Sequence, residues 1–296
     1  MDATGAINFR IGIVTPVVTR LPGAHARWEI DAGIDEITRV VVEAERLGYD
    51  FCTCSEHIAV PTDVAEVRGG TYWDPLALFG YLAARTTRIK LATFVLVLGY
   101  HHPLAIAKRY GTLDVVSDGR VILGVGSGSL EEEFALLDAE FADRGARADD
   151  AMRALRAALA QPRPSYHGEF YEFDDFLVEP HAVQPHVPMW VGGRTARSLR
   201  RAVELGDGWA PFGLRTGELD DLLRRARETE SWAQRDRPLE VILQNDRPWD
   251  PGAEPERVAD QLGRMQAIGA TALAVRLVHH SVDHYCDQLA ALRTLT

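Results

Sequence analysis

The sequence predicts an α/β protein that closes into a (β/α)8 barrel. Eight short apolar segments alternate with eight segments of helical periodicity, the alternation runs through most of the 296 residues, and glycines gather where several strands end. Strands that alternate with helices form parallel sheets, and eight such units in about 250 residues close into a barrel. An open doubly wound sheet is the alternative. We expect residues 1–296 to form a single domain.

The predicted strands are short, apolar and rich in β-branched residues. They are 9–14, 49–55, 89–98, 121–125, 189–191, 208–210, 239–243 and 272–277. The predicted helices carry apolar residues three and four positions apart, and several of them stop at a glycine. They are 34–47, 75–84, 103–116, 146–160, 196–205, 218–233, 255–268 and 282–292.

Two long segments interrupt this alternation. Residues 59–73 follow the second strand, and residues 161–187 form an insertion before the fifth strand that is rich in proline, aromatic and acidic residues. Long loops in barrels often serve as lids or binding loops. The alternative is a surface hairpin that packs on the edge of the barrel.

Composition limits the class of partner. A net charge of −11 argues against nucleic acid or an anionic membrane. Three cysteines (Cys52, Cys54 and Cys286) provide neither a zinc ligand set nor a disulfide framework, which fits a reducing cytoplasm. No signal segment begins the chain, and no apolar run is long enough to span a bilayer. We expect a cytoplasmic protein that acts on small molecules.

Glycines mark two strand ends that could bind a ligand. The strand at 121–125 runs into Gly124, Gly126 and Gly128, and glycines at a strand end indicate close approach by backbone or ligand. The dinucleotide fingerprint is excluded, because the required third glycine is replaced by serine at position 129 or glutamate at position 131.

The second glycine pair, Gly192-Gly193, is followed by Arg194 and Thr195 at the start of a predicted helix. Free N–H groups and the helix dipole favour a phosphate at such a position. The hydroxyl of Ser198 and the charge of Arg197 would add to an anion site there. A tight turn with solvated arginines is the alternative.

Catalytic groups of a barrel lie at the C-terminal ends of its strands. Glu56 and His57 follow the second strand, and histidine is the natural proton donor or acceptor near neutral pH. A structural hydrogen bond is the alternative role for His57. We expect His101 and His102 to be structural or on the surface, since adjacent side chains on extended chain point apart. We expect residues 131–133, three glutamates, to form a solvated first helical turn.

Seven short motifs follow one another along the chain: ERLGYD at 45–50, SEHIAVP at 55–61, TRIKLAT at 87–93, HPLAIAK at 102–108, SDGRVILGVG at 117–126, WVGG at 190–193 and LGDGW at 205–209. In combination, they resemble the motifs of the bacterial luciferase-like flavin and deazaflavin oxidoreductases, over roughly residues 9–212. The likeness is greatest to members that use the deazaflavin coenzyme F420. It implies a (β/α)8 barrel with an insertion, a homodimer, and a ring bound at the C-terminal mouth.

The resemblance also implies roles for individual residues. Thr93, Phe94 and Val95 would form a bulge against the face of the ring, where deazaflavin members often have a cis peptide bond. Gly126, Ser127 and Gly128 would run beside the side chain of the cofactor, and residues 192–195 would hold its phosphate. His57 would act as acid or base near the reactive carbon, with Glu56 tuning or orienting it.

Three functions remain open at this point. The first is an F420-dependent oxidoreductase that transfers a hydride to or from a small organic substrate. The second is a monooxygenase that uses reduced flavin mononucleotide (FMN) and oxygen on the same scaffold. The third is a non-catalytic barrel that only binds a cofactor.

Overall fold

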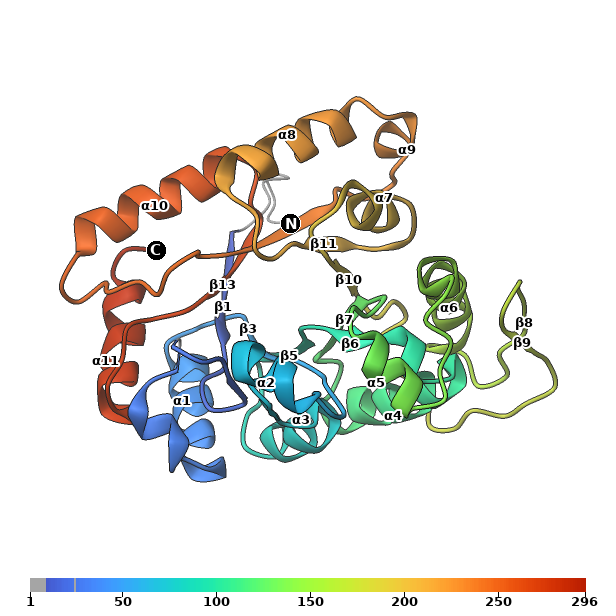
Figure 1. The fold of residues 1–296 in the computed structure, drawn as a ribbon, viewed down its shortest axis with the longest axis horizontal. Coiled ribbons are helices and arrows are strands. Elements are labelled where there is room, and N and C mark those ends of the chain that lie inside the picture. Colours follow the sequence, from blue (N-terminus) through green and yellow to red (C-terminus); the bar gives the residue numbers. More distant parts are fainter. Residues whose placement is uncertain (1–8, 24) are drawn as a thin grey trace.

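The computed structural model describes residues 9–23 and 25–296, and its parallel strands close into a barrel (Figure 1). β13 pairs with β1, with Arg10 opposite Ala272, so the sheet has no open edge and the doubly wound alternative is wrong. The eight barrel strands are β1 (Arg10–Val14), β3 (Phe51–Cys54), β5 (Lys90–Thr93), β7 (Val121–Gly126), β10 (Met189–Gly192), β11 (Gly208–Ala210), β12 (Glu240–Gln244) and β13 (Ala272–Val275).

Side chains fill the interior of the barrel. Phe51 and Trp190 pack edge to face with ring centroids 5.1 Å apart, and small alanines from neighbouring strands complete this inner cluster. The indole N–H of Trp190 donates to Glu240 (2.7 Å), and Glu240 also pairs with Arg10 (2.6 Å) at the start of β1. The N-terminal end of the barrel is thus closed by packing and ion pairing, which leaves the C-terminal mouth for a ligand.

Helices cover the outside of the barrel, and the eight predicted helical regions are confirmed. The helices are α1 (Ile34–Arg46), α3 (Pro75–Ala83), α4 (Pro103–Val116), α6 (Arg144–Ala158), α7 (Ala196–Leu205), α8 (Thr216–Arg227), α9 (Glu230–Ala233), α10 (Pro255–Ala267) and α11 (Val282–Arg293). The region predicted as one helix at 218–233 is divided into α8 and α9, because Thr229 caps a new helix through Trp232 N–H. None of the helices in the described part of the chain is long and apolar enough for a membrane crossing.

The strand predicted at 89–98 is broken in the middle. β5 ends at Thr93, a cis peptide bond joins Phe94 to Val95, and the chain continues as β6 (Leu96–Val97) and the 3-10 helix η2 (Leu98–Tyr100). β6 still pairs with β7, with Leu96 opposite Val125. This break forms the bulge that the family resemblance implied, at the mouth of the barrel.

The two long segments differ in their relation to the mouth. Residues 59–73 contain α2 (Thr62–Arg68) and β4 (Thr71–Tyr72), and β4 pairs with β2 (Thr19–Arg20) beside the mouth. Residues 161–187 contain a hairpin of β8 (Tyr166–His167) and β9 (Glu172–Phe173), which Figure 1 shows at the edge of the molecule beyond α6. Phe173 is buried against the outer core, which supports a surface hairpin for this insertion.

Candidate active site

A cavity of about 520 Å³ lies at the C-terminal mouth of the barrel. Its walls come from residues of six barrel strands (β1, β3, β7, β10, β11 and β12) and from the segments that follow all eight strands. The walls are mainly apolar, with a few polar groups among them, as is usual for sites that bind small molecules and cofactors. Arg68 and Tyr72, from residues 59–73, contribute to the wall, whereas no described residue of 161–187 does.

His57 borders this cavity and is held by a carboxylate far away in the sequence. Its Nδ1–H donates to Glu133 Oε2 (2.7 Å). Glu133 also accepts from Tyr100 OH (2.6 Å) and from the backbone N–H groups of Ile58 (2.6 Å) and Ala59 (3.1 Å). Four donors fill the acceptor sites of one carboxylate, so Glu133 fixes the imidazole ring in one orientation.

Glu133 lies on α5 (Glu131–Leu136), a short helix whose first turn is the one predicted at 131–133. Its neighbour Phe134 anchors the helix against two glycines, where a Cβ on Gly99 or Gly128 would come within 2.4 Å of the Phe134 ring. Gly128 also has φ = +80°, which side chains rarely adopt. The glycine at 128 therefore allows the close approach that brings Glu133 to His57.

The prediction that all three glutamates at 131–133 are solvated is wrong for Glu133, which is 1% exposed. Burial by itself raises the pKa of Glu133, but the hydrogen bonds from Tyr100 and His57 outweigh it and hold the pKa below its usual value. Burial, followed by the bond to Glu133, raises the pKa of Tyr100, which stays a hydrogen-bond donor.

An ionised Glu133 has a direct consequence for His57. The imidazole must carry its proton on Nδ1, which leaves Nε2 as an acceptor while the ring is neutral. Among residues 9–23 and 25–296, none hydrogen-bonds to this Nε2. His57 therefore has one ring nitrogen held by Glu133 and the other without a protein partner, on a ring that borders the cavity.

Glu56 does not orient His57, which corrects the role expected for it. Its Oε1 accepts from His101 Nε2 (2.7 Å), and its Oε2 accepts from Val97 N–H (2.7 Å). Glu56 therefore links β6 and η2 to the end of β3 and so helps to hold the bulge in place. His102 accepts from Leu104 N–H at the start of α4, so both predicted structural histidines hold backbone in place.

The bulge places Phe94 and Val95 in the cavity wall, whereas Thr93 is completely buried. Thr93 donates its hydroxyl to Gly124 O (2.7 Å), which joins β5 to β7. Gly126 and Gly192 border the cavity on both sides of Val95, where a Cβ on either would lie within 2.8 Å of the valine side chain. Ser127, Gly128 and Gly193 complete this side of the wall.

The start of α7 lies beside this glycine wall, but Arg194 and Thr195 are exposed and do not line the cavity itself. Thr195 caps the helix through Ser198 N–H (3.3 Å). The Ser198 hydroxyl is buried and donates to Thr195 O (2.8 Å), so it is not the free donor that the sequence suggested. The N–H groups of Ala196 and Arg197 have no partner in the described chain, as is usual in a first turn.

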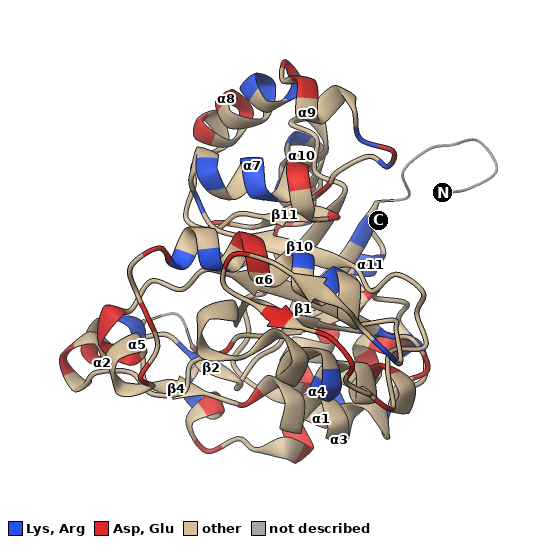
Figure 2. Cartoon of the chain, turned by 90° about the vertical axis from the view of Figure 1, so that its right-hand side faces the viewer, with Lys and Arg blue, Asp and Glu red and all other residues tan. Residues whose placement is uncertain are grey.

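Arginines surround this helix start. Figure 2 shows bands of Lys and Arg on α6 and α7, on the side of the molecule that faces the viewer there. Arg144, at the start of α6, donates its Nε–H to Gly128 O (3.3 Å) and stacks over Phe141. Arg144 is thus a cation beside the glycine wall that sequence reasoning had not assigned to the site.

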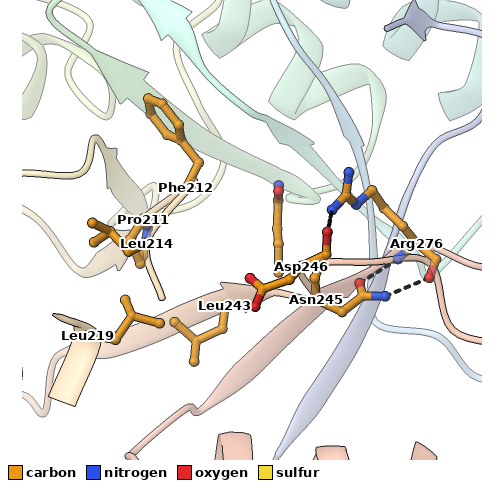
Figure 3. Close-up of a pocket in the computed structure, with 10 residues that line it drawn as sticks. Pro211, Phe212, Leu214, Leu219, Leu243, Asn245, Asp246 and Arg276 are labelled. Carbon is orange, nitrogen blue, oxygen red and sulfur yellow. Dashed lines mark hydrogen bonds between the residues drawn. The ribbon is translucent and has the colours of Figure 1, made fainter. Parts of the chain in front are cut away.

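On the other side of the mouth, a smaller pocket of about 130 Å³ adjoins the cavity and shares Phe212, Gln244 and Arg276 with it (Figure 3). The Arg276 Nη2–H donates to the carbonyls of Asn245 and Asp246 (both 2.7 Å). Asn245 in turn accepts from Arg276 N–H (2.8 Å). These bonds join the ends of β12 and β13 and fix the guanidinium at the mouth.

Some residues of the cavity wall were not predicted from the sequence, because they neither follow a strand directly nor belong to a recognisable motif. Val18, Thr19, Leu21, His25 and Glu29 come from the loop after β1. Leu277, His279 and Tyr285 come from the segment after β13. Only the position of these loops at the C-terminal end of the barrel could have indicated them.

These features define the class of the protein: a (β/α)8 barrel with an imidazole–carboxylate pair and an apolar cavity at its C-terminal mouth. The family model for luciferase-like monooxygenases matches residues 9–245. The chain belongs to this family, whose members are oxidoreductases.

Individual relatives agree with the family assignment. An uncharacterized protein of Mycobacterium tuberculosis is 32% identical over 210 residues, which cover 67% of this chain and 72% of the relative. The F420-dependent glucose-6-phosphate dehydrogenase of Intrasporangium calvum is 31% identical over 244 residues, or 76% and 70% of the two chains. A monooxygenase from Streptomyces bottropensis has the same fold, with a TM-score of 0.78 at 19% identity over 96% and 98% of the chains.

Proposed function

We propose that this protein is an F420-dependent oxidoreductase that transfers a hydride between the deazaflavin cofactor and a small organic substrate. The observation that carries the proposal is the His57 ring, which Glu133 holds with its Nε2 unpartnered at the cavity. The relative of known cofactor at 31% identity supports F420 in preference to FMN.

The residues present fit a flat heterocycle with an anionic tail. Phe94 and Val95 supply an apolar wall, and the glycines at 126–128 and 192–193 leave room along that wall for a narrow chain. At its end, Arg194 and the free N–H groups of α7 suit a phosphate. Arg144 adds charge beside Gly128, which suits the acidic tail of F420 as well.

When bound, the deazaflavin accepts or returns a hydride at its ring carbon. The protein supplies the proton chemistry and the placement. With an alcohol as substrate, His57 Nε2 would take up the hydroxyl proton as the carbonyl forms, and the bound cofactor would supply the hydride acceptor. Glu133 stabilises the resulting imidazolium, and the apolar walls exclude water from the reacting atoms. The reverse direction uses the same groups.

The test is a titration of the purified protein with F420 and, separately, with FMN, followed by cofactor fluorescence. We expect micromolar or tighter binding of F420 and much weaker binding of FMN. Arg194→Ala should weaken F420 binding by about tenfold, because it removes a charge-assisted contact to the phosphate. The matched control, Arg215→Ala, removes an equally exposed arginine at the start of α8 that pairs with Glu218, and this variant should bind normally.

Each other outcome has a clear meaning. A preference for FMN would replace the proposal with the flavin monooxygenase. Binding of neither cofactor would leave a barrel without the proposed chemistry. Binding of F420 that persists in His57→Ala, together with unchanged turnover, would show that His57 has no part in the reaction.

A further inference from the structure

A second histidine borders the same cavity, and its hydrogen bonds differ from those of His57. His279 follows β13, and its side chain is 11% exposed. Trp28, on the 3-10 helix η1 (Arg27–Ile30), donates its indole N–H to His279 Nδ1 (2.9 Å). An indole nitrogen can only donate. Nδ1 is therefore unprotonated, and the ring is neutral with its hydrogen on Nε2.

The environment of the ring agrees with a neutral imidazole. Burial lowers the pKa of His279. The charge of Glu29 acts in the opposite direction, and the neighbouring His284 and His280 lower the pKa further. Tyr285 packs against the ring with centroids 4.9 Å apart, and Trp28 meets it edge to face at 5.6 Å. The ring is thus clamped between aromatic groups, and its orientation is determined.

The Nε2–H of His279 has no acceptor within hydrogen-bonding distance in the described chain. The nearest carboxylate oxygen, Glu29 Oε1, is 3.7 Å away, which is too far for a hydrogen bond. Both Glu29 oxygens already accept from backbone, from Ala26 N–H and from Val17 N–H (2.7 Å each). An N–H donor that has no protein acceptor and lies on a ring bordering a cavity is available to an acceptor on a ligand.

The two histidines lie near each other in the barrel order. β1 pairs with β13 on one side and with β3 on the other, so the loops that carry His279 and His57 flank the end of a single strand. His57 presents an acceptor to the cavity and His279 presents a donor. A hydroxyl group bound between them would satisfy both, because its hydrogen donates and its lone pair accepts.

We propose that His279 donates its Nε2–H to an uncharged hydroxyl or carbonyl oxygen of the substrate, beside the proton acceptor His57. This inference rests on the proposed function and narrows the substrate to an alcohol, aldehyde or ketone at the reacting carbon. The carboxylate of Glu29, 3.7 Å from Nε2, disfavours an anionic oxygen at this position.

The role of His279 in the reaction is to hold and polarise the oxygen. In alcohol oxidation, the C–H electron pair leaves with hydrogen as hydride to the deazaflavin, and the O–H proton moves to His57 Nε2. His279 keeps its own proton throughout and stabilises the oxygen while the carbonyl forms, as preorganised donors do in other active sites. Trp28 does not line the cavity and acts as a positioning residue through the ring.

The tautomer can be tested without cofactor or turnover. In the 296-residue chain labelled with 15N-histidine, long-range proton–nitrogen NMR at neutral pH should show His279 with an unprotonated Nδ1 and a protonated Nε2. His279→Gln assigns the signal, and Trp28→Phe should shift the ring toward a mixture of tautomers or the charged form. A His279 that is charged or protonated on Nδ1 in the unsubstituted protein would overturn the proposal.

Ligand binding gives the second readout, with cyclohexanol and cyclohexanone as probes. Either probe should shift the His279 Nε2 signal, while His284, which does not line the cavity, should stay unchanged. Absence of a shift with both probes, with and without F420, would contradict an oxygen-binding role.

Kinetics gives the third readout on whichever alcohol or carbonyl the protein turns over with F420. His279→Leu should lower kcat/KM by about 5- to 150-fold, because a substrate oxygen loses its donor. His279→Gln, which keeps an N–H donor, should retain most activity. Equal losses in both variants would point to a structural role. If the unsubstituted protein neither binds F420 nor turns over a substrate, the proposed function fails, and the NMR outcomes still decide the role of His279.

Discussion

Two imidazole–carboxylate pairs involve the neighbouring residues Glu56 and His57; they have the same N···O distance but use different ring nitrogens and have different surroundings. His57 pairs with Glu133 and His101 pairs with Glu56, each at 2.7 Å. His57 borders the cavity, whereas His101 does not, and the second oxygen of Glu56 holds the backbone of Val97. The same pair of groups therefore anchors a loop in one case, and in the other it is our candidate for proton transfer.

The difference shows how little sequence adjacency says about function. Glu56 and His57 are neighbours, yet each bonds to a residue from a different loop, 45 and 76 positions away. Both residues line the cavity, but Glu56 accepts from Val97 N–H and His101, whereas His57 pairs with Glu133.

The largest expected effect comes from removing the imidazole at the cavity. His57→Ala should lower kcat by about 10²- to 10⁴-fold, the usual contribution of a general acid or base, while F420 affinity stays within a few-fold. Steady-state kinetics and fluorescence titration would measure both. His101→Ala is the matched control, with an expected loss of less than about tenfold. Similar losses in the two variants would erase the distinction between the pairs.

The second pair should matter most for stability. Glu56→Ala leaves His101 and the Val97 N–H buried without an acceptor, and each unsatisfied group costs about 1–3 kcal/mol. We expect the free energy of unfolding to fall by about 2–5 kcal/mol, measured from the shift of the urea midpoint. Glu131→Ala, on the exposed side of α5, should change it by less than about 0.5 kcal/mol. An equally small change in Glu56→Ala would mean that the bulge does not depend on this carboxylate.

The pH dependence of stability should show whether ionised Glu133 stabilises the fold. Its pKa in the folded protein lies below the unfolded value of about 4.3. The folded state therefore binds fewer protons, and ionised Glu133 contributes stability that is complete above about pH 5 and is lost as pH falls through the folded pKa. Wild type should exceed Glu133→Gln in stability at pH 7, and the gap should narrow below about pH 4.5. If the difference in stability between wild type and Glu133→Gln grew as the pH fell, the pKa of Glu133 in the folded protein would have to lie above its unfolded value, contrary to our expectation.

The smallest effect is expected when one of the four hydrogen-bond donors to Glu133 is removed. Tyr100→Phe removes a single hydrogen bond and should cost about 0.5–1.5 kcal/mol of stability. The loss of this donor should raise the pKa of Glu133 and lower kcat only several-fold. Thermal unfolding and kinetics on the same preparation would measure both effects. A loss as large as that of His57→Ala would make Tyr100 a direct participant in the reaction.

Much of the scaffold was predictable because it depends on local periodicity. The eight strands and the helices between them follow from alternating apolar patterns, and their even alternation indicated closure into a barrel. The position of His57 at the mouth follows from the same rule. The segment at 89–98 was less predictable, because a continuous apolar run conceals the bulge between β5 and β6.

The partner of His57 was beyond local reasoning. Glu133 stands in a run of three glutamates, and the helical turn of α5 exposes two of them and buries the third. That outcome depends on Phe134 packing against Gly99 and Gly128, two segments that lie next to each other only in the folded barrel. No pattern within the run distinguishes Glu133 from its neighbours.

The sequence by itself determined the barrel, the family resemblance and the loop ends that would bear function, because these depend on patterns that repeat within a few residues. Only the tertiary structure decided which carboxylate holds which histidine and which loops close the cavity. Hydrogen bonds such as that between His57 and Glu133, or between Trp28 and His279, join residues 76 and 251 positions apart. Their partners are chosen by the packing that brings strand ends together, and that information is spread over the whole chain.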